Sequence, residues 1–480
     1  MVEASRRGGQ PLNHYSRFAS HILAPALDAL RGTSAMREYA VLRESQWWPQ
    51  DRVLELQSSR LRQLIPDCYA HVPYYQRVMD EGGIDPNSIT SFESLSRIPV
   101  TTKERVRAEP EAFLAQGFPR GQLQKGRTGG STGTPLEFFS TRDARMTHGF
   151  ARALRARQWA GVHMGDPTVF ITKSRAPTSG RSAVSHALRR LCERSSRIDA
   201  ECISDETLPA AVRQIEHARR PALIGYASAI YIVAAYIQEM NLPTPPVAAV
   251  LYGGEPLQGF QRDTIRTVFE VEPLSKYSSF ENYEIAMECP AHRGMHVAAE
   301  DLIVEIVDDD GNPLPSGVNG RVLVTDLHNY GMPLLRYDTG DVGTLVEGQC
   351  ECGRGLPLMS LTLARSGDIL YTPSGKRISP LALGVSALAS LPVRQFQFVQ
   401  ERLDRVVIRL RLSQDIQGDD ATDLTAAVVS TFSPVLGDDV AIEVVFTDRI
   451  EPTTAGKHRF VISQLGPDEI PGGLRQEINQ

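Results

Sequence analysis

The sequence predicts an α/β fold: a large N-terminal domain with mixed, largely parallel sheets and a β-rich subdomain, followed by a small mobile α+β domain. Between residues 143 and 257, apolar runs of strand length alternate with helical patterns, which favours a parallel sheet. From residue 300 onward, short strands joined by Gly/Pro/Asn turns are typical of antiparallel hairpins. The chain of 480 residues is also too long for one ordinary core, which indicates two or three domains.

These patterns predict the domain limits. We expect a loose polar tail over 1–14, an N-terminal domain over 15–365 with its β-rich subdomain at 300–350, and a C-terminal lid domain over 366–480.

The first part of the N-terminal domain is expected to be helical over residues 15–85. An apolar stripe on one helix is predicted from the spacing of Leu54, Leu56, Leu61, Leu64 and Ile65. Thr101 or Thr102 is expected to cap a short helix, with Lys103 and Glu104 in its first turn.

The following residues give the alternating pattern of the parallel sheet. Helices are expected over 143–160, 205–219 and 226–240, with strands over 168–174 and 247–257. The second strand runs into a tight Tyr-Gly-Gly-Glu turn. Ligands collect at the carboxyl ends of parallel strands, so this turn is a candidate binding position.

The C-terminal half is predicted to be rich in strands. An antiparallel hairpin is expected over 300–328, and further strands over 404–412 and 440–447 flank a helix at about 421–432.

Composition excludes several classes of partner. Lys plus Arg is 51 and Asp plus Glu is 57, a net charge of −6, so neither nucleic acid nor an acidic membrane is expected. No apolar run reaches membrane-span length and the first residues lack a signal-peptide core, so a cytoplasmic location is expected. Six cysteines are too few for a disulfide scaffold in this chain.

A glycine-rich stretch, GRTGGSTGTPLEFF at 126–139, has the character of a phosphate-binding loop. Glycines let successive N–H groups point into one concavity, and small hydroxyl residues between them add donors. No Gly-Lys-Ser/Thr follows, so a Walker A loop is excluded. A flexible Gly/Ser/Thr linker is the structural alternative.

Five motifs in fixed order carry a family resemblance. They are TGGSTGTP at 128–135, YGGEPL at 252–257, YSSFENYE at 277–284, LLRYDTGD at 334–341 and EPTTAGKHRF at 451–460. In series they resemble the acyl-adenylate-forming superfamily, with the phenylacetate-CoA ligases and the capsule-biosynthesis and coenzyme F390 synthetase-like proteins as the most similar branch. HVPYY at 71–75 and IPVTTKE at 98–104 resemble that branch's N-terminal signatures.

The resemblance implies attack of a substrate carboxylate on the α-phosphorus of ATP, which gives an acyl-AMP and pyrophosphate. Negative charge gathers on phosphate oxygens in the transition state, so donors and cations are required. Glu281 matches the family's glutamate that meets Mg²⁺, a carboxylate suited to a hard cation. The β- and γ-phosphates would be held by Thr128, Gly129, Gly130, Ser131, Thr132, Gly133 and Thr134.

The resemblance also assigns the rest of the nucleotide. Gly253, Gly254 and Glu255 would form the turn against which adenine lies, and Asp341 matches the carboxylate that accepts both ribose hydroxyls. Arg365 is expected close to the same ribose or phosphate, with a generic salt bridge as its alternative. Asp338 stands where relatives often carry arginine, so it receives no role.

Lys457, between Gly456 and His458, matches the family's catalytic lysine, an ammonium that neutralises charge on the α-phosphate and carboxylate. In the family, the C-terminal domain rotates between the two half-reactions. The turn at 366–368 matches the hinge, and which of its three residues is the pivot stays open.

The acyl pocket is expected to be small and moderately apolar, which fits an aromatic or short hydrophobic acid. Its predicted lining is Tyr226, Ala227, Ser228, Tyr252, Ser279 and Phe280. Phe280 replaces the hydroxyl residue that relatives carry beside the glutamate, and Ser278 replaces a usual glycine. One hydrogen bond to phosphate or the Mg²⁺ shell is therefore in doubt.

A structural zinc site is expected from Cys289, His296, Cys350 and Cys352, since members of this branch carry such a site. His292 competes as the fourth ligand, and free buried cysteines are the alternative. Cys68, Cys192 and Cys202 have no partners by spacing and are expected in the core.

The resemblance predicts an ATP- and Mg²⁺-dependent carboxylic acid ligase that passes the acyl group to a thiol, with CoA as the default. The same first half-reaction serves an amide-forming ligase or an enzyme that loads a carrier protein. A non-catalytic nucleotide-binding homologue and a kinase-like transfer are the remaining alternatives. A monomer or homodimer is expected.

Overall fold

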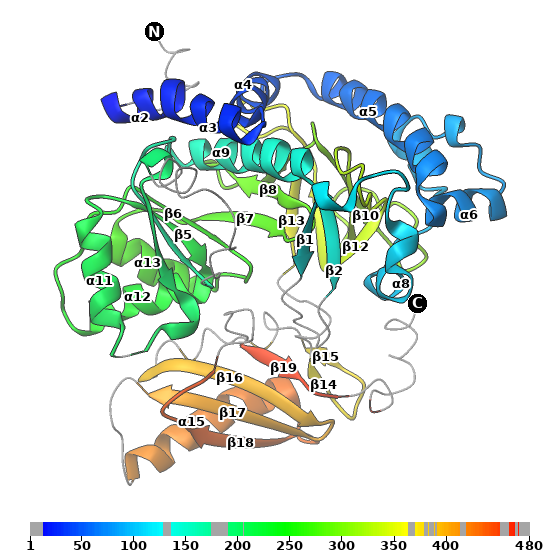
Figure 1. The fold of residues 1–480 in the computed structure, drawn as a ribbon. Helices are drawn as coiled ribbons and strands as arrows, with labels where there is room; N and C mark the ends of the chain where they lie inside the picture. Colours follow the sequence, from blue (N-terminus) through cyan, green and yellow to red (C-terminus); the bar gives the residue numbers. More distant parts are fainter. Residues whose placement is uncertain are drawn as a thin grey trace.

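The computed structural model describes most of the chain (Figure 1). The described residues are 13–127, 136–173, 191–204, 206–362, 370–378, 383, 388, 391–412, 419–451, 460–465 and 469. In this part of the chain, no helix is both long enough and apolar enough to cross a membrane.

Helices form the N-terminal part, as predicted, and cover one side of the larger domain (blue in Figure 1). They are α2 (His14–Phe18), η1 (Ala19–Leu23), α3 (Ala24–Arg31), α4 (Ala35–Ser45), α5 (Gln50–His71) and α6 (Pro73–Glu81). The inward stripe of α5 contains Leu61, Leu64 and Ile65, but Leu54 is exposed and Val53 takes the inward position. The prediction for Leu54 was wrong because Val53, one position earlier, falls on the buried face.

Short elements then lead to the sheet. They are η2 (Pro86–Ser88), α7 (Phe92–Leu95), α8 (Lys103–Ala108), η3 (Pro110–Phe113), η4 (Arg120–Gln122), β1 (Leu123–Arg127) and β2 (Glu137–Thr141). Thr102 caps α8 by accepting a hydrogen bond from the N–H of Arg105 at 3.3 Å, as predicted. Thr101 instead pairs with Tyr337 as an isolated bridge.

An eleven-stranded mixed sheet forms the centre of the larger domain, in the order β10-β11-β12-β13-β9-β8-β7-β6-β5-β3-β4. Its strands are β3 (Thr168–Thr172), β4 (Ser195–Asp199), β5 (Ala222–Tyr226), β6 (Ala249–Gly253), β7 (Leu274–Ser279), β8 (Tyr283–Glu288), β9 (Met295–Val297), β10 (Leu302–Val307), β11 (Gly320–Asp326), β12 (Tyr337–Val346) and β13 (Leu358–Leu361). Strands β3 to β7 are parallel, and the rest pair antiparallel. The predicted hairpin region therefore continues the same sheet.

Helices cover the parallel strands. They are η5 (Ala144–Gly149), α9 (Phe150–Trp159), η6 (Ala200–Cys202), α11 (Leu208–His217), α12 (Ala227–Glu239) and α13 (Gly259–Phe269). Alanine, valine and isoleucine side chains of α11 and α12 pack with β3, β5 and β6 in one buried cluster. This packing fixes the strand ends, where polar groups can gather.

The C-terminal part folds around its own sheet (orange and red in Figure 1). It contains β14 (Leu370–Tyr371), β15 (Arg377–Ile378), β16 (Val393–Arg402), β17 (Arg405–Leu412), α15 (Asp419–Leu436), β18 (Ala441–Phe446) and β19 (Val461–Ser463). The four-stranded order is β18-β17-β16-β19, and α15 buries Val428 and Phe432 against it. The predicted α+β character is confirmed.

Candidate functional site

Three predicted site segments meet at one edge of the sheet. The parallel strands β5, β6 and β7 end at Tyr226, Gly253 and Ser279. Tyr226 pairs with Gly253, and Gly253 pairs with Lys276. Parallel strands present their carboxyl ends at the same edge, so these residues border one surface.

The Tyr-Gly-Gly-Glu turn has a structural reason for both glycines. A Cβ at Gly253 would lie 2.6 Å from the carbonyl oxygen of Lys276, so the pairing with β7 excludes a side chain there. Gly254 has φ +79°, a left-handed conformation that favours glycine. Glu255 accepts a hydrogen bond at 3.1 Å from the N–H of Ser228, which ties the turn to the first residues of α12.

Two tyrosines hold the two carboxylates singled out in the sequence. Tyr277 on β7 donates a hydrogen bond to Oδ2 of Asp341 on β12 at 2.9 Å. Tyr337, the first residue of β12, donates to Oε1 of Glu281 at 2.7 Å. Glu281 is buried in the turn between β7 and β8. The tyrosines were not predicted as site residues, although both lie within the motifs YSSFENYE and LLRYDTGD.

These contacts show that the sheet curls strongly. Strands β7 and β12 are four steps apart in the sheet, a separation of roughly 19 Å in a flat sheet. Their tyrosine and aspartate side chains nevertheless meet at 2.9 Å. The curvature therefore brings the two motif carboxylates to one region of the molecule.

Burial keeps the Tyr337 hydroxyl protonated. Desolvation, followed by the negative charge and hydrogen bond of Glu281, raises the pKa of Tyr337 well above its usual range. The hydroxyl is thus a permanent donor to Glu281, and it orients that carboxylate.

The Asp-Thr-Gly-Asp turn is held by the segment around Thr101. The Thr101 N–H donates to the Arg336 carbonyl at 3.0 Å, and the Asp338 N–H donates back to the Thr101 carbonyl at 2.9 Å. The Lys103 ammonium donates to the carbonyl of Thr339 inside the turn. Lys103 was predicted only as part of a helix, because a backbone acceptor leaves no sequence signal.

Asp338, which received no predicted role, pairs with Arg321 at 3.2 Å. Arg321 lies on the neighbouring strand β11, so Asp338 takes part in a structural ion pair between β11 and β12.

Several predicted residues lie outside the described part of the chain. They are Thr128, Gly129, Gly130, Ser131, Thr132, Gly133, Thr134, Arg365, the hinge residues 366–368 and Lys457. The strands that flank the glycine-rich stretch are described. Arg127 of β1 pairs with Glu137 of β2 in antiparallel register, so the stretch connects the two strands of a hairpin.

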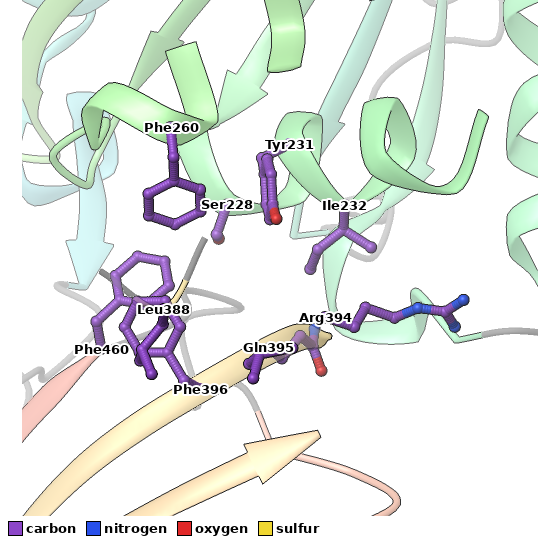
Figure 2. A pocket seen from close by; sticks show the side chains of 10 residues that line it. Ser228, Tyr231, Ile232, Phe260, Leu388, Arg394, Gln395, Phe396 and Phe460 are labelled. Carbon is purple, nitrogen blue, oxygen red and sulfur yellow. The ribbon is translucent and has the colours of Figure 1, made fainter. Parts of the chain in front are cut away.

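The predicted acyl-pocket residues differ in exposure. Ala227, Ser228 and Tyr252 are buried, and Phe280 is 36% exposed. Among the described residues, Ser228 also lines a recess shared with Tyr231 and with residues of the C-terminal part (Figure 2).

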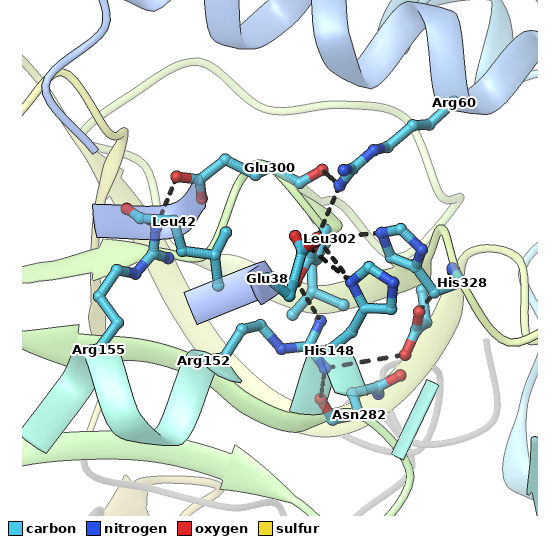
Figure 3. A network of polar contacts seen from close by, with 12 residues as sticks. Glu38, Leu42, Arg60, His148, Arg152, Arg155, Asn282, Glu300, Leu302 and His328 are labelled. Carbon is cyan, nitrogen blue, oxygen red and sulfur yellow. Dashed lines mark hydrogen bonds and ion pairs between the residues drawn. The ribbon is translucent and has the colours of Figure 1, made fainter. Parts of the chain in front are cut away.

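A buried polar network supports the Glu281 turn from behind (Figure 3). Arg152 of α9 donates to the Asn282 carbonyl at 2.8 Å and lies 3.7 Å from Asp301. Asp301 also contacts His328 at 3.0 Å and His148 at 3.5 Å. No sequence motif predicted this network.

The two imidazoles of the network stack with their centroids 3.4 Å apart. Arg60 donates to Asp301 at 2.6 Å, and with Arg152 it already supplies two cations to this carboxylate. A metal ion at His148, Asp301 and His328 is therefore disfavoured, although these groups lie within 4.8 Å of one another.

A second cluster joins the four predicted zinc ligands, Cys289, His296, Cys350 and Cys352, within 4.8 Å. The sulfurs of Cys289 and Cys350 are 3.6 Å apart, and Cys352 Sγ lies 3.3 Å from Nε2 of His296. The edges of a tetrahedral zinc site are about 3.8 Å between sulfurs and about 3.6 Å between sulfur and nitrogen. The donor set and its spacing therefore fit zinc.

Hydrogen bonds from Cys289 and His296 hold the pKa of Cys352 far below its usual range, which favours a thiolate. His292 lies instead beside Glu288 at 3.2 Å, so His296 is the histidine of the cluster. Cys68 and Cys192 are buried as predicted. Cys202 is exposed, so its predicted core position was wrong, because it ends a short 3₁₀ helix at the surface.

Comparisons with known proteins agree with the motifs. Residues 370–464 match the family described as the CapK C-terminal domain. The phenylacetate-coenzyme A ligase of Thermus thermophilus is 27% identical over 384 residues, which cover 76% of this chain and 83% of that protein. The phenylacetate-coenzyme A ligase of Escherichia coli is 26% identical over 337 residues, or 67% of this chain and 72% of that protein.

Solved structures share the fold. A 2-hydroxyisobutyryl-CoA ligase in the postadenylation state superposes with a TM-score of 0.71 at 18% identity, over 90% of this chain and 93% of that chain. The same ligase in its thioesterification state, with 2-HIB-AMP and CoA, gives a TM-score of 0.58 at 20% identity over the same shares.

Proposed function

Because the chain belongs to the phenylacetate-CoA ligase and CapK branch of the adenylate-forming enzymes, we propose that it activates a carboxylic acid with ATP and transfers the acyl group. The products of the first half-reaction are an acyl-AMP and pyrophosphate. The acceptor in the second is a thiol, with CoA as the default, and the acid is aromatic or small and hydrophobic.

The two tyrosine–carboxylate pairs support this proposal most directly. Tyr277 with Asp341 and Tyr337 with Glu281 connect segments about sixty residues apart at one edge of the sheet. A scaffold would not require two oriented carboxylates there. ATP activation does, because one carboxylate receives the ribose diol and the other serves the cation on the phosphates.

We assign the remaining roles by motif. Asp341 accepts the ribose hydroxyls, Gly253 to Glu255 border the adenine, and residues 128–134 donate to the outer phosphates. Arg365 is assigned to the ribose or phosphate. Glu281 would hold Mg²⁺, which supplies charge neutralisation to the phosphate oxygens. Lys457 neutralises the α-phosphate and carboxylate as charge develops.

The acid-binding pocket is assigned to the surface beside the strand ends. Tyr226 ends β5, Ala227 and Ser228 begin α12, Tyr252 precedes the glycine turn, and Ser279 ends β7. Phe280, which follows Ser279, is assigned to the same pocket. The apolar character of these residues favours an aromatic or short hydrophobic side chain on the acid.

The cysteine cluster is assigned to structural zinc. Three thiols and one imidazole make a closed ligand set, which leaves no position for substrate. The loop that carries Cys350 and Cys352 is tied to the N-terminal helices, since the Gly355 N–H donates to the Gln46 carbonyl at 3.0 Å. Bound zinc would fasten this loop to β8 and β9.

The decisive experiment measures ATP–pyrophosphate exchange by the purified chain with a panel of carboxylic acids. Exchange that depends on acid and Mg²⁺, with release of AMP, supports the proposal. Release of ADP would instead indicate a kinase-like transfer. No exchange with any acid, despite nucleotide binding, would indicate a non-catalytic homologue and overturn the proposal.

The acceptor is decided by a second set of reactions. CoA, amines and a phosphopantetheinylated carrier protein are added to enzyme preloaded with acyl-AMP. The acceptor that consumes the adenylate fastest separates the thiol ligase from the amide-forming and carrier-loading alternatives.

A further inference from the structure

An aromatic contact joins the C-terminal part to the larger domain (Figure 2). Phe260, in the first turn of α13, packs against Tyr231 of α12 with centroids 5.5 Å apart and against Phe396 of β16 at 6.1 Å. Phe396 continues to Phe460 at 5.0 Å. Phe260 is thus a side chain of the larger domain that packs on the hydrophobic core of the C-terminal part.

An ion pair forms a second contact between α12 and the C-terminal part. Arg394 of β16 pairs with Glu239, the last residue of α12. Between the aromatic and ionic contacts lies a small recess, lined from both sides by Ser228, Tyr231, Ile232, Phe260, Phe396 and Phe460. Its apolar walls meet only when the C-terminal part is seated on α12 and α13.

The position of this contact links it to the proposed chemistry. Phe260 follows Glu255 of the strand-end turn by five residues. The Phe398 N–H donates to the Phe460 carbonyl at 2.7 Å, which anchors Phe460 on β16. Lys457 precedes Phe460 by three residues, so covalent reach alone keeps their Cα atoms within about 11 Å.

We infer that Phe260 is a positioning residue for the adenylation half-reaction, because its packing on Phe396 and Phe460 seats the domain that carries Lys457 beside the nucleotide-binding edge. This inference rests on the proposed function. Loss of the ring lowers the population of the seated state and leaves the two domains folded.

The test separates the two half-reactions in the full-length protein. Phe260→Ala is expected to lower the rate of ATP–pyrophosphate exchange about tenfold, with transfer from preformed acyl-AMP to the acceptor within twofold of wild type. Phe260→Tyr keeps the ring and should restore exchange. Phe446→Ala, which removes a partly exposed ring from the outer strand β18, is the matched control and should leave both rates unchanged.

A parallel fall in both half-reactions, or exchange within twofold of wild type in Phe260→Ala, would overturn the inference. Glu239→Gln provides a second variant on the surface, where folding is not at risk. A smaller loss of exchange alone, in the same direction, is expected because only the ionic contact weakens.

Hydrogen–deuterium exchange distinguishes this inference from the proposed function. In Phe260→Ala, amides of 259–262 and 393–396 should exchange faster, and those of β5 and β6 should not change. If wild type forms no adenylate with any acid, the proposed function fails and the inferred role fails with it. If wild type is active but these amides keep their protection in the variant, only the inference fails.

Discussion

The hydroxyl of Tyr277 lies 2.9 Å from Oδ2 of Asp341, although the strands that carry them are four steps apart in the sheet. This hydrogen bond fixes the carboxylate that we assign to the ribose. Orientation before binding matters because the two hydroxyls of a vicinal diol can donate to both carboxylate oxygens only when the carboxylate faces them.

Tyr277→Phe is expected to raise the KM for ATP about three- to tenfold, with a smaller change in kcat, because one hydrogen bond is worth roughly 0.5–1.5 kcal/mol. Steady-state kinetics with ATP as the varied substrate check this. Tyr69→Phe is the matched control, since Tyr69 donates to Asp80 at the same 2.9 Å on the surface of α5 and α6. An equal rise in both variants would contradict the role of Tyr277.

Tyr337→Phe should act on the cation rather than the nucleoside. Glu281 is buried and Tyr337 is a hydrogen-bond donor to it, so the variant leaves a buried carboxylate oxygen without this partner. We expect the Mg²⁺ concentration for half-maximal pyrophosphate exchange to rise several-fold. A Mg²⁺ titration at saturating ATP measures this, and an unchanged midpoint would argue against Glu281 as the metal-facing residue.

The cysteine cluster gives a prediction that needs no activity. Elemental analysis of protein purified without added metal should find about one zinc per chain, and Cys352→Ser should lose it, with a lower melting temperature. Cys202→Ser changes an exposed cysteine outside the cluster and should keep the metal. If the purified wild-type protein contains no zinc, and a chelator leaves its melting temperature unchanged, the free-cysteine alternative is favoured.

The network around Asp301 predicts how stability depends on pH. Burial lowers the pKa of His148, but its hydrogen bond and attraction to Asp301, with Glu38 and Asp143 nearby, outweigh burial and raise it above 6.5. A pKa that is higher in the folded state than in the unfolded state stabilises the fold. This stabilisation is complete at pH values below the pKa of the unfolded state, and it is lost as pH rises through the pKa of the folded state.

The pKa of Asp301 has the opposite shift. Burial raises it, yet hydrogen bonds and charges from His148 and His328 hold it well below 3.8. The stabilisation from Asp301 is present above pH 3.8, and it is lost as pH falls through the lower pKa of the folded state. The Asp301 carboxylate is faced by the cations Arg60 and Arg152 and by the imidazoles of His148 and His328.

His148→Gln should therefore lower the free energy of unfolding most at and below pH 6.5, and the difference from wild type should shrink as pH rises. Urea denaturation at several pH values measures both curves. His21→Gln, at an exposed histidine of η1, provides the control. A difference that is constant with pH would show that the proton on His148 does not contribute.

The sequence predicted the alternation of helices and strands in the larger domain, and it missed the contacts that orient Asp341 and Glu281. Of the three strand ends, only the one at Gly253 was predicted, from an apolar run that enters a glycine turn. The strands β5 and β7, which end at Tyr226 and Ser279, were missed. The curl of the sheet, which joins Tyr277 to Asp341, depends on long-range pairing that no local pattern encodes. The contact of Lys103 with a backbone carbonyl and the His148–His328 stack were missed for the same reason.

Lys103 provides the last prediction. Its ammonium donates to the carbonyl of Thr339, and a Cβ at Gly340 would lie 3.1 Å from its Nζ, so it packs directly on the turn that carries Asp341. Lys103→Met keeps the aliphatic stem and removes the donor, which should loosen the turn and raise the KM for ATP about three- to tenfold.

Lys173→Met, which breaks a lysine–glutamate pair beside β3, seven steps from β12 in the strand order, is the control and should leave the KM for ATP unchanged. Nucleotide binding measured by calorimetry without acid should weaken by the same factor in Lys103→Met, because the ribose that we assign to this turn binds before any chemistry occurs. If kcat falls instead while ATP affinity is retained, Lys103 acts on the transition state and its assignment as a support for the turn is wrong.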